Sequence, residues 1–174
     1  MHILLIADGR SPTTHHWVQS LLEGGQRVSL VSTFPCETLP GLDALYVLPV
    51  AFAGMAGSQV GSRATGGAPK KSTLRRAVSR FRSAFMALRY RLGPATLGRH
   101  ARALQRIVAA AQPDVVHALR IPFEGILAAY TPPGTPFVVS IWGNDLTLHA
   151  RRSESMARLT RRALRRADGL MADA

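Results

Sequence analysis

Six short apolar runs alternate with longer amphipathic patterns, and this alternation constrains the fold more than any other feature of the chain. The runs are almost continuously hydrophobic, as strands covered on both faces are. They occupy residues 2–7, 27–32, 44–50, 114–119, 137–142 and 169–174. Strands that alternate with helices predict a parallel sheet in an α/β layered domain, with helices on both faces of the sheet.

The helical patterns lie between these strands. They cover residues 11–25, 72–92, 94–111, 122–130 and 153–167. The first has Ser11 as a candidate N-cap and Pro12 at its first helical position, and the second and third are expected as two separate basic helices. Residues 53–71 are rich in Gly, Ala and Ser without periodicity, so we expect a flexible surface loop there.

The composition limits the class of protein further. A chain of 174 residues supports one substantial hydrophobic core. Its one cysteine, Cys36, excludes an internal disulfide and a multi-cysteine zinc site, which favours a reducing compartment. The N-terminus lacks the basic region of a signal peptide, and the apolar run at 44–57 is shorter than the roughly 18 to 20 residues that span a bilayer. We therefore expect a cytoplasmic protein.

The net charge of +12 indicates an anionic partner. Basic residues concentrate in 70–106 and 151–166, but neither block carries regular stacking aromatics, and the chain has no zinc-finger or RNA-recognition signature. Nucleic acid binding is therefore not supported. The apolar residues of helix 72–92, such as Phe81 and Phe85, fit either an interfacial helix or a stripe that packs on the sheet.

Polar residues gather after three of the predicted strands. The groups are Asp8, Gly9, Arg10, Ser11, His15 and His16; then His117, Arg120 and Glu124; and finally Trp142, Gly143, Asn144 and Asp145. The carboxyl ends of parallel strands share one edge of a sheet, and ligands of such sheets bind there. The three groups therefore predict a binding crevice.

Each group also has a purely structural interpretation. His117 follows two valines and fits a hydrogen-bonded core histidine, while Arg120 and Glu124 fit a structural ion pair. Trp142 fits a packing aromatic, and residues 144–145 fit a turn or a helix cap. The segment after the first strand, DGRS, is not GxGxxG, so a dinucleotide fingerprint is absent.

Three segments carry a family resemblance. The stretches MHILLIADGRSPTTHHWVQSLLEGGQRVSLVS, QPDVVHALRIPFEGILAAY and TPFVVSIWGNDLTLHA, in this order, resemble the N-terminal half of the group 1 (family 4) glycosyltransferases. That family commonly reads P-D, two residues of Val or Ile, and H-A-H in the second stretch, and H-G, Ser or Thr, and D in the third. Here Leu119 replaces the second histidine, Trp142 replaces the later one, and Asn144 replaces the Ser or Thr.

The resemblance implies a GT-B architecture, in which two Rossmann-like domains enclose a cleft. Residues 1–174 then form the N-terminal, acceptor-side domain, and a C-terminal donor domain is expected beyond the last strand pattern, so that this domain alone is inactive. Members are retaining and metal-independent, and they transfer sugar from a UDP- or GDP-sugar to a glycan, lipid-linked or small-molecule acceptor. Some dock on anionic membranes, which implies peripheral membrane contact through helix 72–92.

The resemblance also suggests roles for the polar groups. The catalytic candidates are His117, Arg120 and Glu124, with Glu124 orienting Arg120 near the position of the missing histidine. The expected substrate-binding residues are Gly9, Arg10, Ser11, His15, His16, Trp142, Asn144 and Asp145. Amides at residues 9–11 face the diphosphate, Trp142 stacks on a sugar, and Asn144 or Asp145 holds hydroxyls, while a cap at Asp145 remains the equal alternative.

Two other classes of protein remain open from the sequence. The first is a non-catalytic α/β binding module whose basic face docks on an anionic membrane or polyanion. The second is another Rossmann-like enzyme, such as a sugar-nucleotide epimerase.

Overall fold

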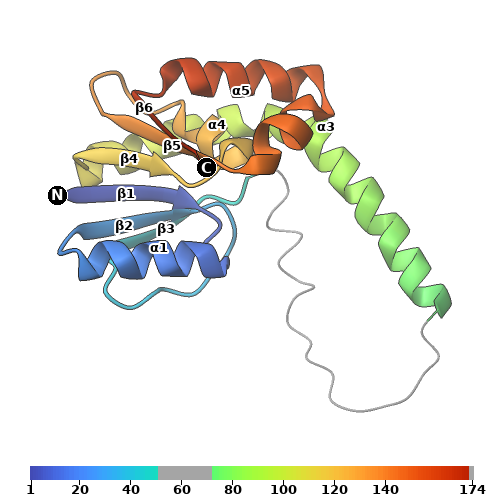
Figure 1. Ribbon diagram of the computed structural model, residues 1–174, viewed down its shortest axis with the longest axis horizontal. Helices are drawn as coiled ribbons and strands as arrows, with labels where there is room; N and C mark the ends of the chain where they lie inside the picture. Colours follow the sequence, from blue (N-terminus) through green and yellow to red (C-terminus); the bar gives the residue numbers. More distant parts are fainter. Residues whose placement is uncertain (51–71, 173–174) are drawn as a thin grey trace, which may run out of the picture.

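The computed structural model describes residues 1–50 and 72–172, without the side chains of residues 72–89 and 94. Six strands of this part form one parallel sheet in the order β3-β2-β1-β4-β5-β6 (Figure 1). They are β1 (His2–Ala7), β2 (Arg27–Ser32), β3 (Ala44–Val47), β4 (Val115–Ala118), β5 (Phe137–Ile141) and β6 (Gly169–Ala172). The predicted parallel α/β sheet is therefore confirmed, while the predicted loop at 53–71 and residues 173–174 lie outside the described residues.

Helices cover both faces of the sheet, as the hydrophobic runs predict. Alternate residues of β1 point to opposite faces: Ile3 and Leu5 join the core beneath α1 (Pro12–Glu23), and Leu4 and Ile6 join the core on the other face. The other face carries α3 (Ser72–Ala111), α4 (Ile126–Ala128) and α5 (Glu154–Arg166). Figure 1 shows α1 on one side of the strands and α5 on the opposite side.

The strand order reverses direction beside β1. The chain proceeds outward from β1 through β2 to β3, and it then returns to place β4 on the other side of β1. The helices that follow β1 and β4 leave in opposite directions at such a switch point, so a crevice opens at the carboxyl ends of these two strands. The site described below lies at this position.

The prediction of two separate helices at 72–92 and 94–111 was wrong, because α3 is one continuous helix of 40 residues. Pro94 has no N–H to donate to the carbonyl of Tyr90, one turn earlier. The hydroxyl of Ser153, the N-cap residue of α5, donates to this carbonyl over 3.4 Å and also accepts from the amide of Met156. A tertiary contact thus supports the helix where its own sequence interrupts it.

The predicted short helix at 122–130 begins as an irregular turn, η2 (Ile121–Gly125), before α4. Phe123 has a φ of 65°, a left-handed conformation that costs a non-glycine residue about 1–3 kcal/mol. Gly125, the last residue of this turn, packs closely against its neighbours, because an added Cβ would lie 2.9 Å from both the Arg120 carbonyl and Val139 Cγ2. The turn is therefore held tightly beside the crevice.

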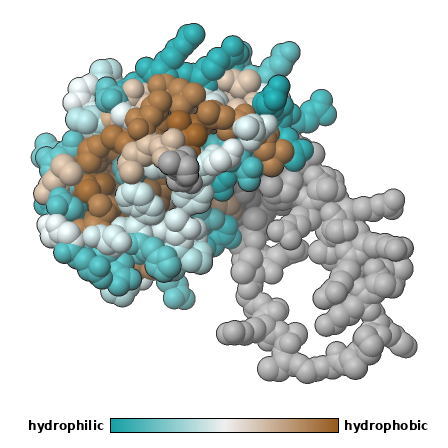
Figure 2. All heavy atoms as spheres, in the orientation of Figure 1, coloured by the Kyte–Doolittle hydropathy of each residue, from teal (hydrophilic) through white to brown (hydrophobic). Residues whose placement is uncertain are grey.

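Strands β5 and β6 have no helix on the α1 side within the described ranges. Met171 is 44% exposed, and Figure 2 shows hydrophobic surface in the band between α1 and α5. In the residues that were searched, namely the described ones, we find no helix that combines the length and hydrophobicity needed to cross a membrane.

Candidate functional site

A cavity of about 280 Å³ lies at the carboxyl ends of β1 and β4. It is lined by Ala7, Asp8, Ser11, Thr14, Phe34, Tyr90, Leu119, Arg120, Pro122, Phe123, Glu124, Trp142 and His149. All three predicted polar groups contribute to it: Asp8 and Ser11 follow β1, Arg120 and Glu124 follow β4, and Trp142 follows β5. The structure therefore brings together side chains that are more than a hundred residues apart.

Asp145 is the carboxylate that positions Arg120, which corrects the expected pairing of Arg120 with Glu124. Arg120 Nη2 donates to Asp145 Oδ1 over 2.9 Å, and its Nε lies 3.3 Å from the same oxygen. Asp145 Oδ2 accepts from the amides of Ile121 and Trp142 at 3.1 and 3.2 Å. Through these hydrogen bonds Asp145 links the ends of β4 and β5. Its side chain is fully buried, so it does not reach sugar hydroxyls.

Glu124 is 6% exposed and lies on the β1–β2 side of the cavity. The hydroxyl of Thr33, which directly follows β2, donates to Glu124 Oε1 over 2.8 Å. This contact holds a carboxylate at the cavity wall, where it can accept a hydrogen bond from a ligand hydroxyl.

The loop after β1 is closed by its own hydrogen bonds. The amide of Gly9 donates to Ser32 Oγ, and the amides of Arg10 and Ser11 donate to Asp8 Oδ1 and to the Asp8 carbonyl, all at 3.0 Å. The prediction that these amides face a diphosphate is therefore wrong for this conformation. Gly9 serves close packing instead, since an added Cβ would lie 2.8 Å from Ser32 Oγ.

Arg10 does not line the cavity either. Its guanidinium forms a two-point ion pair with Asp8, with Nε and Nη2 each 3.0 Å from a carboxylate oxygen. The same group lies 3.7 Å from the ring centre of Phe34, a cation–π distance. Arg10 therefore fixes the side chains of Asp8 and Phe34, both of which line the cavity.

Three predicted histidines lie away from the cavity. His15 is exposed at α1, and its Nε2 donates to the Gly9 carbonyl over 2.8 Å, while His16 is exposed on the same helix. His117 is buried, and its Nε2 lies 2.9 Å from Ser140 Oγ. Its ring and that of Trp17 pack edge to face, with ring centres 5.1 Å apart. Burial lowers the pKa of His117 to about 4, so this side chain is a neutral core histidine on the α1 face.

Trp142 lines the cavity, and the Arg120 guanidinium lies 5.3 Å from the centre of its ring. The indole and the guanidinium therefore border the same cavity. Asn144 is exposed, does not line the cavity and makes no side-chain cap, so its expected role with hydroxyls has no support from its position.

His149 and Tyr90 are site residues that the sequence analysis did not find. The Tyr90 hydroxyl and His149 Nδ1 share a hydrogen bond, and the two rings stack with centres 5.6 Å apart. Tyr90 comes from α3, and His149 ends η3 (Asp145–His149), just before η4 (Ala150–Arg152). The position of His149, four residues after Asp145 in the segment that follows β5, could have marked it as a site residue. Its partner Tyr90 could not be found in this way, because it lies 59 residues away in the sequence.

No group of three or more His, Cys, Asp or Glu side chains in the described part of the chain is placed to hold a metal ion. The residues that line the cavity offer two carboxylates, one guanidinium, one imidazole and aromatic rings. Such a set recognises hydroxyls, apolar sugar faces and anionic groups.

The strand order and the position of the cavity define the chain as a parallel α/β domain with a polar crevice at its switch point. Within that class, the chain belongs to the glycosyl transferase 4-like domain family, which matches residues 8–174. The resemblance noted in the sequence is thereby confirmed.

Two solved structures are similar at low identity. The calicheamicin glycosyltransferase CalG4 is 17% identical, with a TM-score of 0.44 over 80% of this chain and 32% of CalG4. The spinosyn rhamnosyltransferase SpnG, complexed with thymidine diphosphate, is 15% identical, with a TM-score of 0.41 over 94% of this chain and 41% of SpnG. The chain thus spans less than half of either protein. No curated protein matches it significantly.

Proposed function

We propose that this chain is the acceptor-side domain of a retaining, metal-independent glycosyltransferase. The enzyme transfers a sugar from a nucleotide sugar, UDP- or GDP-linked, to a glycan, lipid-linked or small-molecule acceptor. The observation that carries the proposal is the cavity at the switch point, built from three strand ends in a chain of this family. A second, donor-binding domain completes the cleft.

Within the cavity, Glu124 accepts a hydrogen bond from the acceptor hydroxyl, and the Trp142 ring packs against a sugar face. In the transfer, the acceptor oxygen forms a bond to the anomeric carbon while the bond from that carbon to the diphosphate oxygen breaks. The hydroxyl proton passes to the departing diphosphate. Correct placement of the hydroxyl accounts for the contribution of this domain to the rate.

The test uses the full-length protein and a panel of UDP- and GDP-sugars with candidate acceptors. We expect acceptor-dependent release of nucleoside diphosphate that persists in EDTA, and a product with the anomeric configuration of the donor. Absence of turnover across the panel, together with salt-sensitive binding to anionic vesicles, would favour the non-catalytic binding module. Inversion of the anomeric carbon would contradict the retaining mechanism alone.

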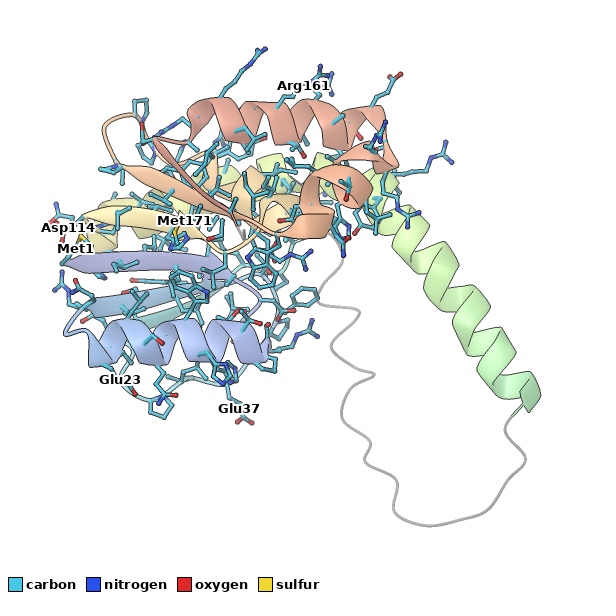
Figure 3. The ribbon with its side chains drawn as sticks, viewed as in Figure 1. Met1, Glu23, Glu37, Asp114, Arg161 and Met171 are labelled. Carbon is cyan, nitrogen blue, oxygen red and sulfur yellow. The ribbon has the colours of Figure 1, made fainter. Side chains whose placement is uncertain are left out.

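Glu124→Gln is expected to lower the transfer rate about 100-fold, because the acceptor hydroxyl loses the carboxylate that positions it. The amide keeps an oxygen for the Thr33 hydroxyl, so the fold is preserved while the negative charge is lost. Glu37→Gln is the matched control, because Figure 3 shows Glu37 pointing away from the body of the protein, and its side chain is exposed. Full activity of Glu124→Gln would remove Glu124 from the proposed site.

A further inference from the structure

Positive charge gathers on the side of the cavity next to β5. Arg120 lines this wall with a side chain that is 38% exposed, and its Nη1 has no hydrogen-bond partner in the part of the chain that the structure describes. Arg152 lies beside Tyr90, with its guanidinium 5.8 Å from the centre of the ring. Arg152 is not itself among the residues that line the cavity, but both guanidinium groups lie close enough to His149 to lower its pKa.

His149 supplies a third polar group at the same wall. Its Nδ1 is engaged with the Tyr90 hydroxyl, and within the described ranges its Nε2 has no hydrogen-bond partner. Burial lowers the pKa of His149 below its ordinary value, and the positive charges of Arg120 and Arg152 lower it further, while Asp145 opposes them. The ring is therefore neutral at pH 7 and can gain a proton when negative charge arrives.

The carboxylates around the cavity do not neutralise this wall fully. Asp145 faces His149 and Arg120, but its second oxygen is taken by two backbone amides. Asp8 is paired with Arg10, and Glu124 lies with Thr33 at the β1–β2 side. The cavity is thus acidic toward β1 and β2 and basic toward β5.

We propose that Arg120, His149 and Arg152 form a subsite for an anionic group, a phosphate or a carboxylate, of the bound substrate. The inference rests on the proposed function for the identity of that substrate as an acceptor or donor sugar. Guanidinium groups bind such oxygens through charge-assisted hydrogen bonds, and the Tyr90 contact holds the imidazole in position. The hydroxyl to be glycosylated then lies toward Glu124, at the opposite wall.

The subsite makes anion affinity depend on pH. The charged or titratable groups that face His149 are Tyr90 from α3, Arg120 after β4, Asp145 of its own segment and Arg152 of η4. A bound anion raises the pKa of His149, so binding takes up a proton. Affinity for an anion of constant charge therefore rises as the pH falls, and affinity for a neutral sugar does not.

The experiment titrates the protein with glucuronate, with glucose as the neutral match, and with UDP. His149 ring signals and the Trp142 indole signal are followed by NMR. We expect glucuronate to raise the pKa of His149 and to bind about fivefold more tightly at about pH 5.5 than at about pH 7.5. His149→Gln should abolish this pH dependence, and Arg152→Ala should weaken binding about fivefold at either pH.

Arg161→Ala is the matched control, because Arg161 is exposed on α5 and points to solvent in Figure 3. An unchanged His149 pKa, or equal losses in Arg152→Ala and Arg161→Ala, would overturn the subsite. Tighter binding of UDP than of glucuronate at about pH 7.5, where the terminal phosphate of UDP is ionised, assigns the subsite to the donor diphosphate, and the reverse assigns it to the acceptor. These outcomes do not depend on turnover, so the subsite and the proposed function can fail separately.

Discussion

Asp145→Ala is expected to lower the free energy of unfolding by about 3–5 kcal/mol. The substitution leaves Arg120 without its carboxylate and leaves the amides of Ile121 and Trp142 without an acceptor. Each buried donor that loses its partner costs about 1–3 kcal/mol, and Asp145 itself is fully buried. Urea denaturation of the two proteins measures the difference.

Asp43→Ala is the control for this prediction. Asp43 is exposed, and its contacts are long: 3.8 Å to His2 Nε2 and 3.5 Å to Ser29 Oγ. Its removal should cost less than about 1 kcal/mol. Equal losses in the two variants would show that Asp145 does not join the ends of β4 and β5.

Acidification from about pH 6.5 to 4 is expected to remove about 3 kcal/mol of stability through His117 alone. Burial lowers the pKa of this histidine to about 4 in the folded protein, below the ordinary value of 6.5 that applies to the unfolded chain. The unfolded chain therefore binds the proton first as the pH falls. The contribution of His117 is complete above the unfolded pKa and is lost as the pH approaches the folded one.

The difference in unfolding free energy between pH 7 and pH 4 measures this contribution. His117→Gln should reduce that difference by about 3 kcal/mol, because its amide stays neutral over the whole range. His16→Gln, at an exposed position of α1, should leave the difference unchanged. A His117 pKa near 6.5, measured by NMR, would contradict the buried neutral state.

The sequence predicted the strands well because a parallel sheet buries both faces of each strand and so leaves continuous hydrophobic runs. It also predicted which strand ends would meet, since the carboxyl ends of parallel strands share one edge. The continuous helix α3 was not predicted, because the donor that satisfies the Tyr90 carbonyl is Ser153, which lies 63 residues later.

The hydrogen-bond partners within the site could not be predicted from the sequence for the same reason, because they lie far apart along the chain. Arg120 and Glu124 are four residues apart, yet they contact Asp145 and Thr33, which come from other strand ends. A spacing of four residues would bring Arg120 and Glu124 together in a regular helix. The irregular turn η2 separates the two side chains instead. The Tyr90–His149 contact likewise joins α3 to the segment after β5.

Two rates in Trp142→Ala of the full-length enzyme test most directly whether the cavity binds the acceptor. Hydrolysis of the nucleotide sugar by water requires the donor site alone, whereas sugar transfer also requires the acceptor site. We expect hydrolysis to stay within about twofold of the unmodified enzyme while transfer falls at least about tenfold. If both rates fall together, or if transfer is unchanged, the cavity is not the acceptor site.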